Sequence, residues 1–191
     1  MTPATVYSAL DDWAGNGRQS VWYSCKNYRM NVYCDGENVW IRDVHKFNET
    51  IRDFYLDEPC KTHSIIYETL PIMDGLNFTD ENTVAGIYLG KGKITETKRA
   101  DQEFVVLIEG DDNRLTMQIS EEEIGITGEK DFSRPIITKK ECETVMEFKE
   151  EEISYLHDEV SYAVNIAEGK FDTVTKRLVS SEQKLCLKIA E

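Results

Sequence analysis

The chain has 191 residues, of which 40% are hydrophobic and 10% aromatic, a composition that indicates a folded protein and excludes a disordered one. Its net charge of −14 is concentrated in residues 101–159, which hold 18 acidic and 6 basic side chains (−12), against 14 and 11 in the first hundred residues. This acidity disfavours direct binding of nucleic acid, and the longest apolar runs fall short of the roughly 18 residues of a membrane span.

The N-terminus and the cysteines suggest a compartment. Asp11 and Asp12 interrupt any candidate signal peptide, and no basic segment precedes an apolar stretch. The five cysteines are an odd number without secretory context, which is typical of reduced thiols. We therefore expect a cytoplasmic protein.

The first predicted element is a short helix. Thr2 and Pro3 resemble a helix cap and first turn, and Val6, Leu10 and Trp13 then form a one-sided apolar stripe. Glycines at 15 and 17 end the pattern.

A β-meander is predicted next, with strands at residues 20–25, 28–34 and 39–42 and turn residues between them. Because successive strand residues face opposite sides, the segment divides into two faces. One face is apolar and is predicted to lie in the core: Val21, Tyr23, Cys25, Tyr28, Met30, Val32, Cys34, Val39 and Ile41. The opposite face carries Trp22, Arg29, Asn31, Tyr33, Trp40 and Arg42.

The middle of the chain mixes both periodicities. From Asp43 onward a helical pattern places Phe47, Ile51, Phe54 and Tyr55 on one side. Strands are predicted at residues 64–70, 84–89, 93–97, 103–109 and 114–120, the last two joined by a turn that contains Asp111 and Asp112.

A long amphipathic helix is predicted at residues 138–169, because Thr138 and Glu141 form a capping box and the apolar residues that follow fall within about 100° of arc. Residues from 172 onward are predicted to be helical or mixed, although the alternation of Leu185, Leu187 and Ile189 also fits a strand. Five acids of the long helix fall in a separate arc: Glu143, Glu147, Glu150, Glu151 and Asp158.

The expected fold is therefore α+β. An antiparallel sheet flanked by short helices occupies residues 1–135, and a helical region at residues 136–191 packs on it as a second unit or as part of a single domain.

The acidic row suggests the leading hypothesis for function. We expect a non-enzymatic binding protein that occupies a basic surface of a partner protein, such as the nucleic-acid-binding groove of a nuclease, and so inhibits or regulates it. Five carboxylates along such a helix are spaced more sparsely than phosphates on DNA, so mimicry would need further acids. These are Asp111, Asp112, Glu121, Glu122 and Glu123. The alternative is that the row is an ordinary solvated helix face.

Two other classes of function stay open. Trp22, Tyr33 and Trp40 beside Arg29 and Arg42 could form a platform for a small ligand or a substrate, unless a predicted helix covers them. The C-terminal helices could instead mediate assembly into oligomers, and the sequence leaves the oligomeric state open.

Catalytic and metal motifs are weak. The chain has no G-x-S-x-G elbow, and residues 90–93 contain glycines and lysines but precede a strand, unlike a phosphate loop. Cys60 and His63 have the spacing of zinc ligands, but no second close pair accompanies them. The sequence therefore predicts no cofactor and no metal.

Overall fold

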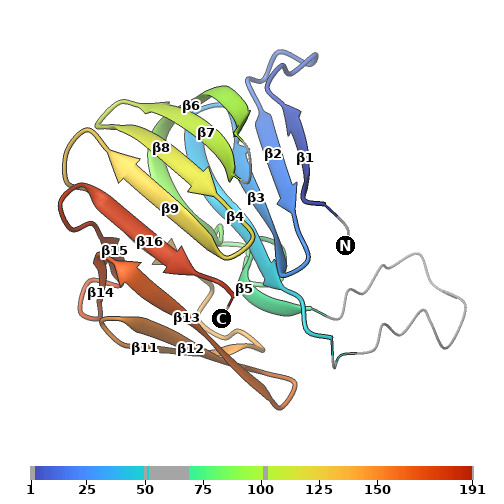
Figure 1. The fold of residues 1–191 in the computed structure, drawn as a ribbon, viewed down its shortest axis with the longest axis vertical. Coiled ribbons are helices and arrows are strands. Elements are labelled where there is room, and N and C mark those ends of the chain that lie inside the picture. The colour runs from blue at the N-terminus through green and yellow to red at the C-terminus, as the bar shows by residue number, and fades with distance from the viewer. Residues whose placement is uncertain (1–2, 50, 52–68, 101–102, 191) are drawn as a thin grey trace, which may run out of the picture.

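The computed structural model describes residues 3–49, 51, 69–100 and 103–190, and every regular element in these residues is a β-strand (Figure 1). The predicted α+β fold is wrong: the described chain is all-β. Among the described residues, no helix is long and apolar enough to cross a membrane.

The first layer is an antiparallel sheet from the N-terminal part of the chain. It contains β1 (Thr5–Ala9), β2 (Gln19–Ser24), β3 (Tyr28–Cys34), β4 (Asn38–Lys46), β5 (Leu70–Asp74) and the start of β6 (Gly86–Ala100). The order is β1-β2-β3-β4-β6, and β5 pairs with another part of β4. This sheet is the predicted meander with strands added at both sides.

β6 continues into the second layer. Its first residues pair with β4 and its later residues pair with β7, so that one strand belongs to both layers. Gly92 lies at this transition with a φ of 155°, and a Cβ there would stand 2.2 Å from the carbonyl oxygen of Glu109. Only glycine fits this close approach of two backbones.

The second layer has the order β6-β7-β8-β9-β16-β13-β12-β11. Its strands are β7 (Glu103–Gly110), β8 (Arg114–Ile119), β9 (Glu123–Gly128), β11 (Val145–Phe148), β12 (Glu152–His157), β13 (Val160–Glu168) and β16 (Lys184–Lys188). β10 (Ser133–Ile137) pairs with β6 and β15, while β14 (Lys170–Asp172) pairs with β15 (Arg177–Val179).

The two layers face each other across one hydrophobic core. In Figure 1, β3 and β4 run behind β8 and β9. The Tyr28 hydroxyl, from β3, donates to the Ser120 carbonyl at 2.6 Å, in the turn between β8 and β9. All nine residues of the predicted apolar face are buried, which confirms the prediction for β2, β3 and β4. Sheet and core both run across the proposed boundary at residue 135, since β9 pairs with β16.

Each predicted helix that falls on described residues is wrong. The first predicted helix coincides with β1. The second was predicted to begin at Asp43, where β4 instead extends to Lys46. Most of the rest of that helix, and most of the strand predicted at 64–70, fall at residues 50 and 52–68, which lie outside the described residues. The strands predicted at 84–89 and 93–97 are parts of β6. At the C-terminus the alternative of a strand at Leu185–Ile189 is confirmed by β16.

The predicted long helix is three short strands, β11, β12 and β13, joined by tight turns. The turn between β12 and β13 consists of Asp158 and Glu159, with φ angles of 45° and 67°. Two residues with positive φ form the type I′ geometry that joins strands in hairpins, and asparagine and glycine usually mark it. Because acids stand here instead, the sequence has no turn signal, and the apolar residues of three strands imitate a helical stripe.

Candidate functional site

The acids predicted to line one helix face are distributed over a hairpin and its flanks. Glu147 lies on β11, Glu150 and Glu151 lie in the turn after it, Asp158 lies in the next turn, and Glu143 precedes β11. Glu150 is 3.6 Å from the Lys170 ammonium, and Asp158 is 3.5 Å from the His157 imidazole. The predicted row, which depended on the helix, is therefore not formed.

Asp111 and Asp112 lie in the turn between β7 and β8, where Asp112 has a structural partner. Its carboxylate accepts hydrogen bonds from both terminal nitrogens of Arg134, at 2.9 and 3.4 Å, and the Arg134 side chain is only 7% exposed. Although partial burial opposes it, this guanidinium lowers the pKa of Asp112 below its usual value. Asp112 thus neutralises a charge of the protein itself.

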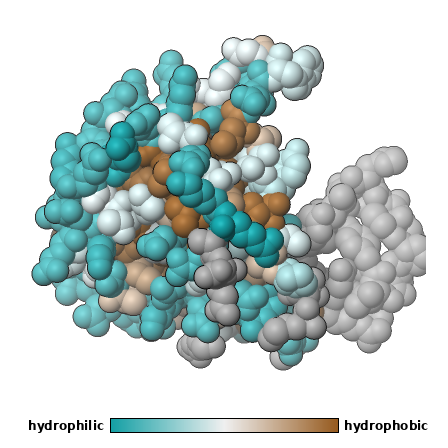
Figure 2. Space-filling model, turned by 45° about the horizontal axis from the view of Figure 1, so that its top comes forward, coloured by the Kyte–Doolittle hydropathy of each residue, from teal (hydrophilic) through white to brown (hydrophobic). Residues whose placement is uncertain are grey.

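Glu121 and Glu122 border a groove between the two layers, whereas Glu123 is the first residue of β9 and is not part of the groove lining. We call this groove the β1–β7 groove; its volume is about 560 Å³, within the range of ligand pockets. Glu121 also forms an ion pair with Lys26 at 3.3 Å. Figure 2 shows one face of the molecule, on which apolar residues reach the surface among polar ones. The groove is lined by Pro3, Ala4, Val6, Tyr23, Arg99, Glu103, Phe104, Ser120, Glu121 and Glu122.

Tyr23 is the unusual member of this lining. The residue is 2% exposed, and its buried hydroxyl meets the Cys25 thiol but has no partner of good hydrogen-bond geometry among the described residues. Buried polar groups are nearly always paired, because an unpaired one costs about 1–3 kcal/mol. Burial, reinforced by Cys25 and Glu121, raises the pKa of the Tyr23 phenol well above its usual value, so the group stays neutral and can donate.

The aromatic face is partly exposed. Trp22 is 37% exposed, whereas Tyr33, Trp40 and Arg42 are half-buried, as is Arg29. The Arg42 guanidinium lies 5.3 Å from the centre of the Tyr33 ring, and Trp40 packs on Tyr88 with ring centres 4.6 Å apart. Neither predicted helix covers this face within the described residues.

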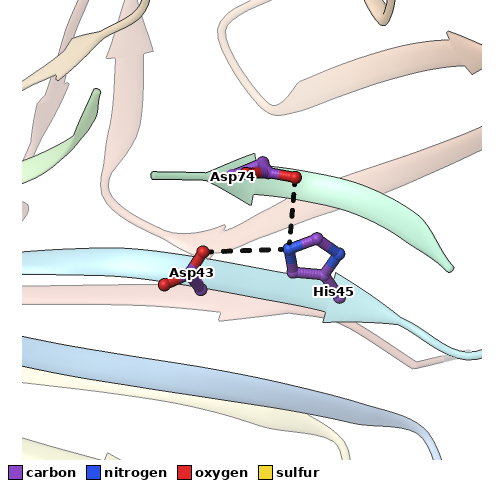
Figure 3. Close-up of side chains that lie close together, drawn as sticks. All are labelled: Asp43, His45 and Asp74. Carbon is purple, nitrogen blue, oxygen red and sulfur yellow. Dashed lines mark ion pairs between the residues drawn. The ribbon is translucent and has the colours of Figure 1, made fainter. Parts of the chain in front are cut away.

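A second concave site holds polar groups from both layers. It is a pocket of about 100 Å³ that includes His45, Asp74, Lys139, Glu143 and His157 in its lining. Asp43 lies beside it and forms, with His45 and Asp74, a cluster whose donor atoms all lie within 4.8 Å of one another (Figure 3). Sequence analysis missed this cluster because it assigned His45 to a helix. The usable signal was the i, i+2 spacing of Asp43 and His45, which puts both on one face of a strand.

The other sulfur and histidine candidates add little. Cys60 and His63, which have zinc-ligand spacing, lie outside the described residues. Cys25 and Cys34 are buried in the core, and burial raises the pKa of the Cys34 thiol. The Cys34 thiol is therefore a poor nucleophile.

Comparisons with known protein families, with curated proteins and with solved structures found no match to this chain.

Proposed function

We propose that the protein binds a basic segment of a partner protein in the β1–β7 groove and so regulates that partner. This keeps the docking hypothesis but moves the contact surface from the predicted helix to the groove. The observation that carries the proposal is a set of carboxylates at the rim of an apolar groove whose floor holds an unpaired, buried hydroxyl.

The shape and chemistry of the groove suit a lysine or arginine side chain. Val6 and Phe104 offer apolar surface for the aliphatic stem, and the exposed Glu103 and Glu122 can receive the cationic head. The Tyr23 hydroxyl is buried beneath this surface, so it can donate to a carbonyl of the same segment only after the lining of the groove moves. The formal charge of the lining is −2, because three glutamates stand against Arg99.

The backbone of β1 can contribute as well. β1 ends the sheet order and pairs only with β2 among the described strands, so its outer edge can accept another strand. Arg99 donates to the Ala4 carbonyl at 3.2 Å, which leaves the rest of the edge to an extended segment. Such a partner would gain main-chain hydrogen bonds from β1 and charge pairing from the rim.

The acidity of the chain would add long-range steering towards a basic partner, in the cytoplasm that we expect for it. Steering acts on the association rate and weakens as salt screens the charges, because the Debye length falls to about 3 Å at 1 M.

Fluorescence anisotropy with a labelled peptide of alternating lysine and valine tests the proposal, with a glutamate–valine peptide as the negative probe. The double variant Glu103→Lys/Glu122→Lys should bind the basic peptide at least about tenfold more weakly, a loss of about 1.4 kcal/mol, since each exposed pair contributes up to about 1 kcal/mol and reversal adds repulsion.

The matched control is Glu147→Lys/Glu159→Lys, which changes the net charge equally but on the hairpin at the other end of the sheet order. It should retain most of the affinity. Equal losses in the two double variants would mean that only the overall charge matters, and the groove would be rejected as the docking site. Absence of binding to the wild type would also reject it.

A further inference from the structure

Two carboxylates and one imidazole meet where β4 pairs with β5. Asp43 and Asp74 are direct partners across the two antiparallel strands, and His45 lies two residues beyond Asp43. The side chains of Asp43, His45 and Asp74 are 18%, 7% and 9% exposed, respectively. Like charges directly opposite each other destabilise a sheet, and burial increases that cost. A cation between the two carboxylates would remove it.

The imidazole of His45 points between the two acids (Figure 3). Its Nε2 lies 3.7 Å from Asp74 Oδ2 and 3.9 Å from Asp43 Oδ1, and both distances exceed the range of a hydrogen bond. Its Nδ1 is 2.8 Å from the Thr69 hydroxyl. Histidines that bind metals are usually held by such a contact at the second ring nitrogen, which fixes the orientation of the first.

Both carboxylates are held in place by the turn that follows β5. The amide of Gly75 donates to Asp43 Oδ1 at 3.1 Å, while the amides of Leu76 and Asn77 donate to Asp74 Oδ1 at 2.9 and 2.7 Å. The Asn77 side chain donates to Asp74 Oδ2 at 2.8 Å. Each of these bonds uses one lone pair, so the oxygens facing His45 can still coordinate an ion.

We infer that Asp43, His45 and Asp74 form a binding site for a divalent transition-metal ion such as Zn²⁺ or Mn²⁺. Donors that share a tetrahedral ion at about 2.1 Å lie about 3.4 Å apart. The two distances from His45 Nε2 exceed this separation by about 0.3 and 0.5 Å, and all three donor atoms lie within 4.8 Å of one another, so the carboxylates would have to move towards each other to hold the ion. The imidazole favours these ions over Mg²⁺ and Ca²⁺, which prefer oxygen ligands alone.

Three protein ligands leave at least one coordination position for water or another molecule, as in catalytic metal sites. The adjacent pocket can supply that ligand, because His45 and Asp74 belong to its lining together with Lys139, Glu143 and His157. Lys139 gives the pocket a cation suited to an anionic ligand. The site shares no residue with the β1–β7 groove, so the inference of metal binding does not depend on the proposed docking function.

Isothermal titration calorimetry with ZnCl₂, MnCl₂ and MgCl₂, on the reduced full chain at neutral pH, tests the inference. We expect one site for Zn²⁺ or Mn²⁺ that Mg²⁺ does not fill. Asp43→Asn and His45→Gln should each weaken binding at least about tenfold, since loss of a ligand should exceed the effect of losing an outer contact. Circular dichroism of each variant would verify its fold.

The matched control is Asp172→Asn. Asp172 accepts the amides of Val174 and Thr175 as Asp74 accepts those of Leu76 and Asn77, but it is not part of the cluster. Its affinity for the metal should equal that of the wild type. If His45→Gln fails to fold, Thr69→Val replaces it and should weaken binding by about tenfold through the orientation of His45. The inference would be overturned if Asp43→Asn bound the metal as tightly as the wild type and His45→Gln, or Thr69→Val in its place, did so too. Absence of Zn²⁺ and Mn²⁺ binding to the wild type at millimolar concentrations would also overturn it.

Discussion

Two neighbouring tyrosines allow a matched test of the packing beneath the groove. Tyr23 and Tyr28 are both at most 2% exposed, and their ring centres are 5.7 Å apart. The Tyr28 hydroxyl donates to the Ser120 carbonyl at 2.6 Å, whereas the Tyr23 hydroxyl has no partner of good hydrogen-bond geometry among the described residues. Replacing either by phenylalanine deletes one oxygen atom and preserves the ring.

The two substitutions should have opposite effects on the free energy of unfolding. Tyr28→Phe removes a hydrogen bond and leaves the half-buried Ser120 carbonyl without this donor, so it should destabilise the protein by about 1–2 kcal/mol. Tyr23→Phe removes an unpaired group and should stabilise by up to about 1 kcal/mol, or about 2–4 °C in melting temperature for a chain of this size. The two variants should therefore differ by about 2 kcal/mol.

Urea unfolding followed by tryptophan fluorescence measures both values, provided that the slope with denaturant is unchanged. The same variants separate stability from binding. Tyr23→Phe should lower the affinity for the basic peptide about fivefold if the Tyr23 hydroxyl donates to the bound segment, whereas Tyr28→Phe should leave that affinity unchanged. If Tyr23→Phe lost as much stability as Tyr28→Phe, the Tyr23 hydroxyl would have a hydrogen-bond partner in the folded protein. It would then not be an unpaired donor available to a bound segment.

Three further predictions concern the frame of the fold. Gly92→Ala should lower the free energy of unfolding by at least about 2 kcal/mol, because its Cβ would meet a backbone oxygen at 2.2 Å. The control is Gly125→Ala, where the nearest atom to the new Cβ is 3.7 Å away, and it should lower the free energy of unfolding far less in the same urea titration. Glu159→Gly should stabilise by about 1 kcal/mol by relieving its φ of 67°; a lower melting temperature would contradict this. Asp112→Asn should destabilise by about 1 kcal/mol at pH 7 through Arg134, because solvent screens a carboxylate that is 56% exposed. Since the folded pKa of Asp112 is lowered, its contribution is complete above the unfolded value of about 3.9 and is lost as pH falls through the folded pKa. The stabilities of wild type and variant should therefore converge in acid.

The sequence predicted the meander well because its signals agree. Alternation from Val21 to Ile41 and turn residues such as Asp35 and Gly36 indicate the same strands, and every predicted core residue there is buried. The C-terminal part failed because its turns carry no such signal. Asp158 and Glu159, like Glu182 and Gln183 before β16, adopt positive φ without glycine or asparagine. Pairing with neighbouring strands determines those turns, and local sequence does not report it.

The candidate sites were beyond the reach of sequence for a different reason. The groove joins Val6 to Phe104 and Glu122, and the metal cluster joins His45 to Asp74, so both depend on which strands are neighbours. The acidity of residues 101–159 was visible in the sequence, but its arrangement required the fold. Part of it is neutralised by the protein's own cations, as at Asp112.

The position of β16 has a consequence for synthesis on the ribosome. β16 lies between β9 and β13, although it follows every other described strand in the sequence. Until residues 184–188 emerge, the hairpins from β11 to β13 lack the strand with which β13 pairs, and one edge of β9 is unpaired. The second layer therefore cannot close until residues 184–188 have been synthesised, and termination just before them would leave two unpaired strand edges prone to aggregation.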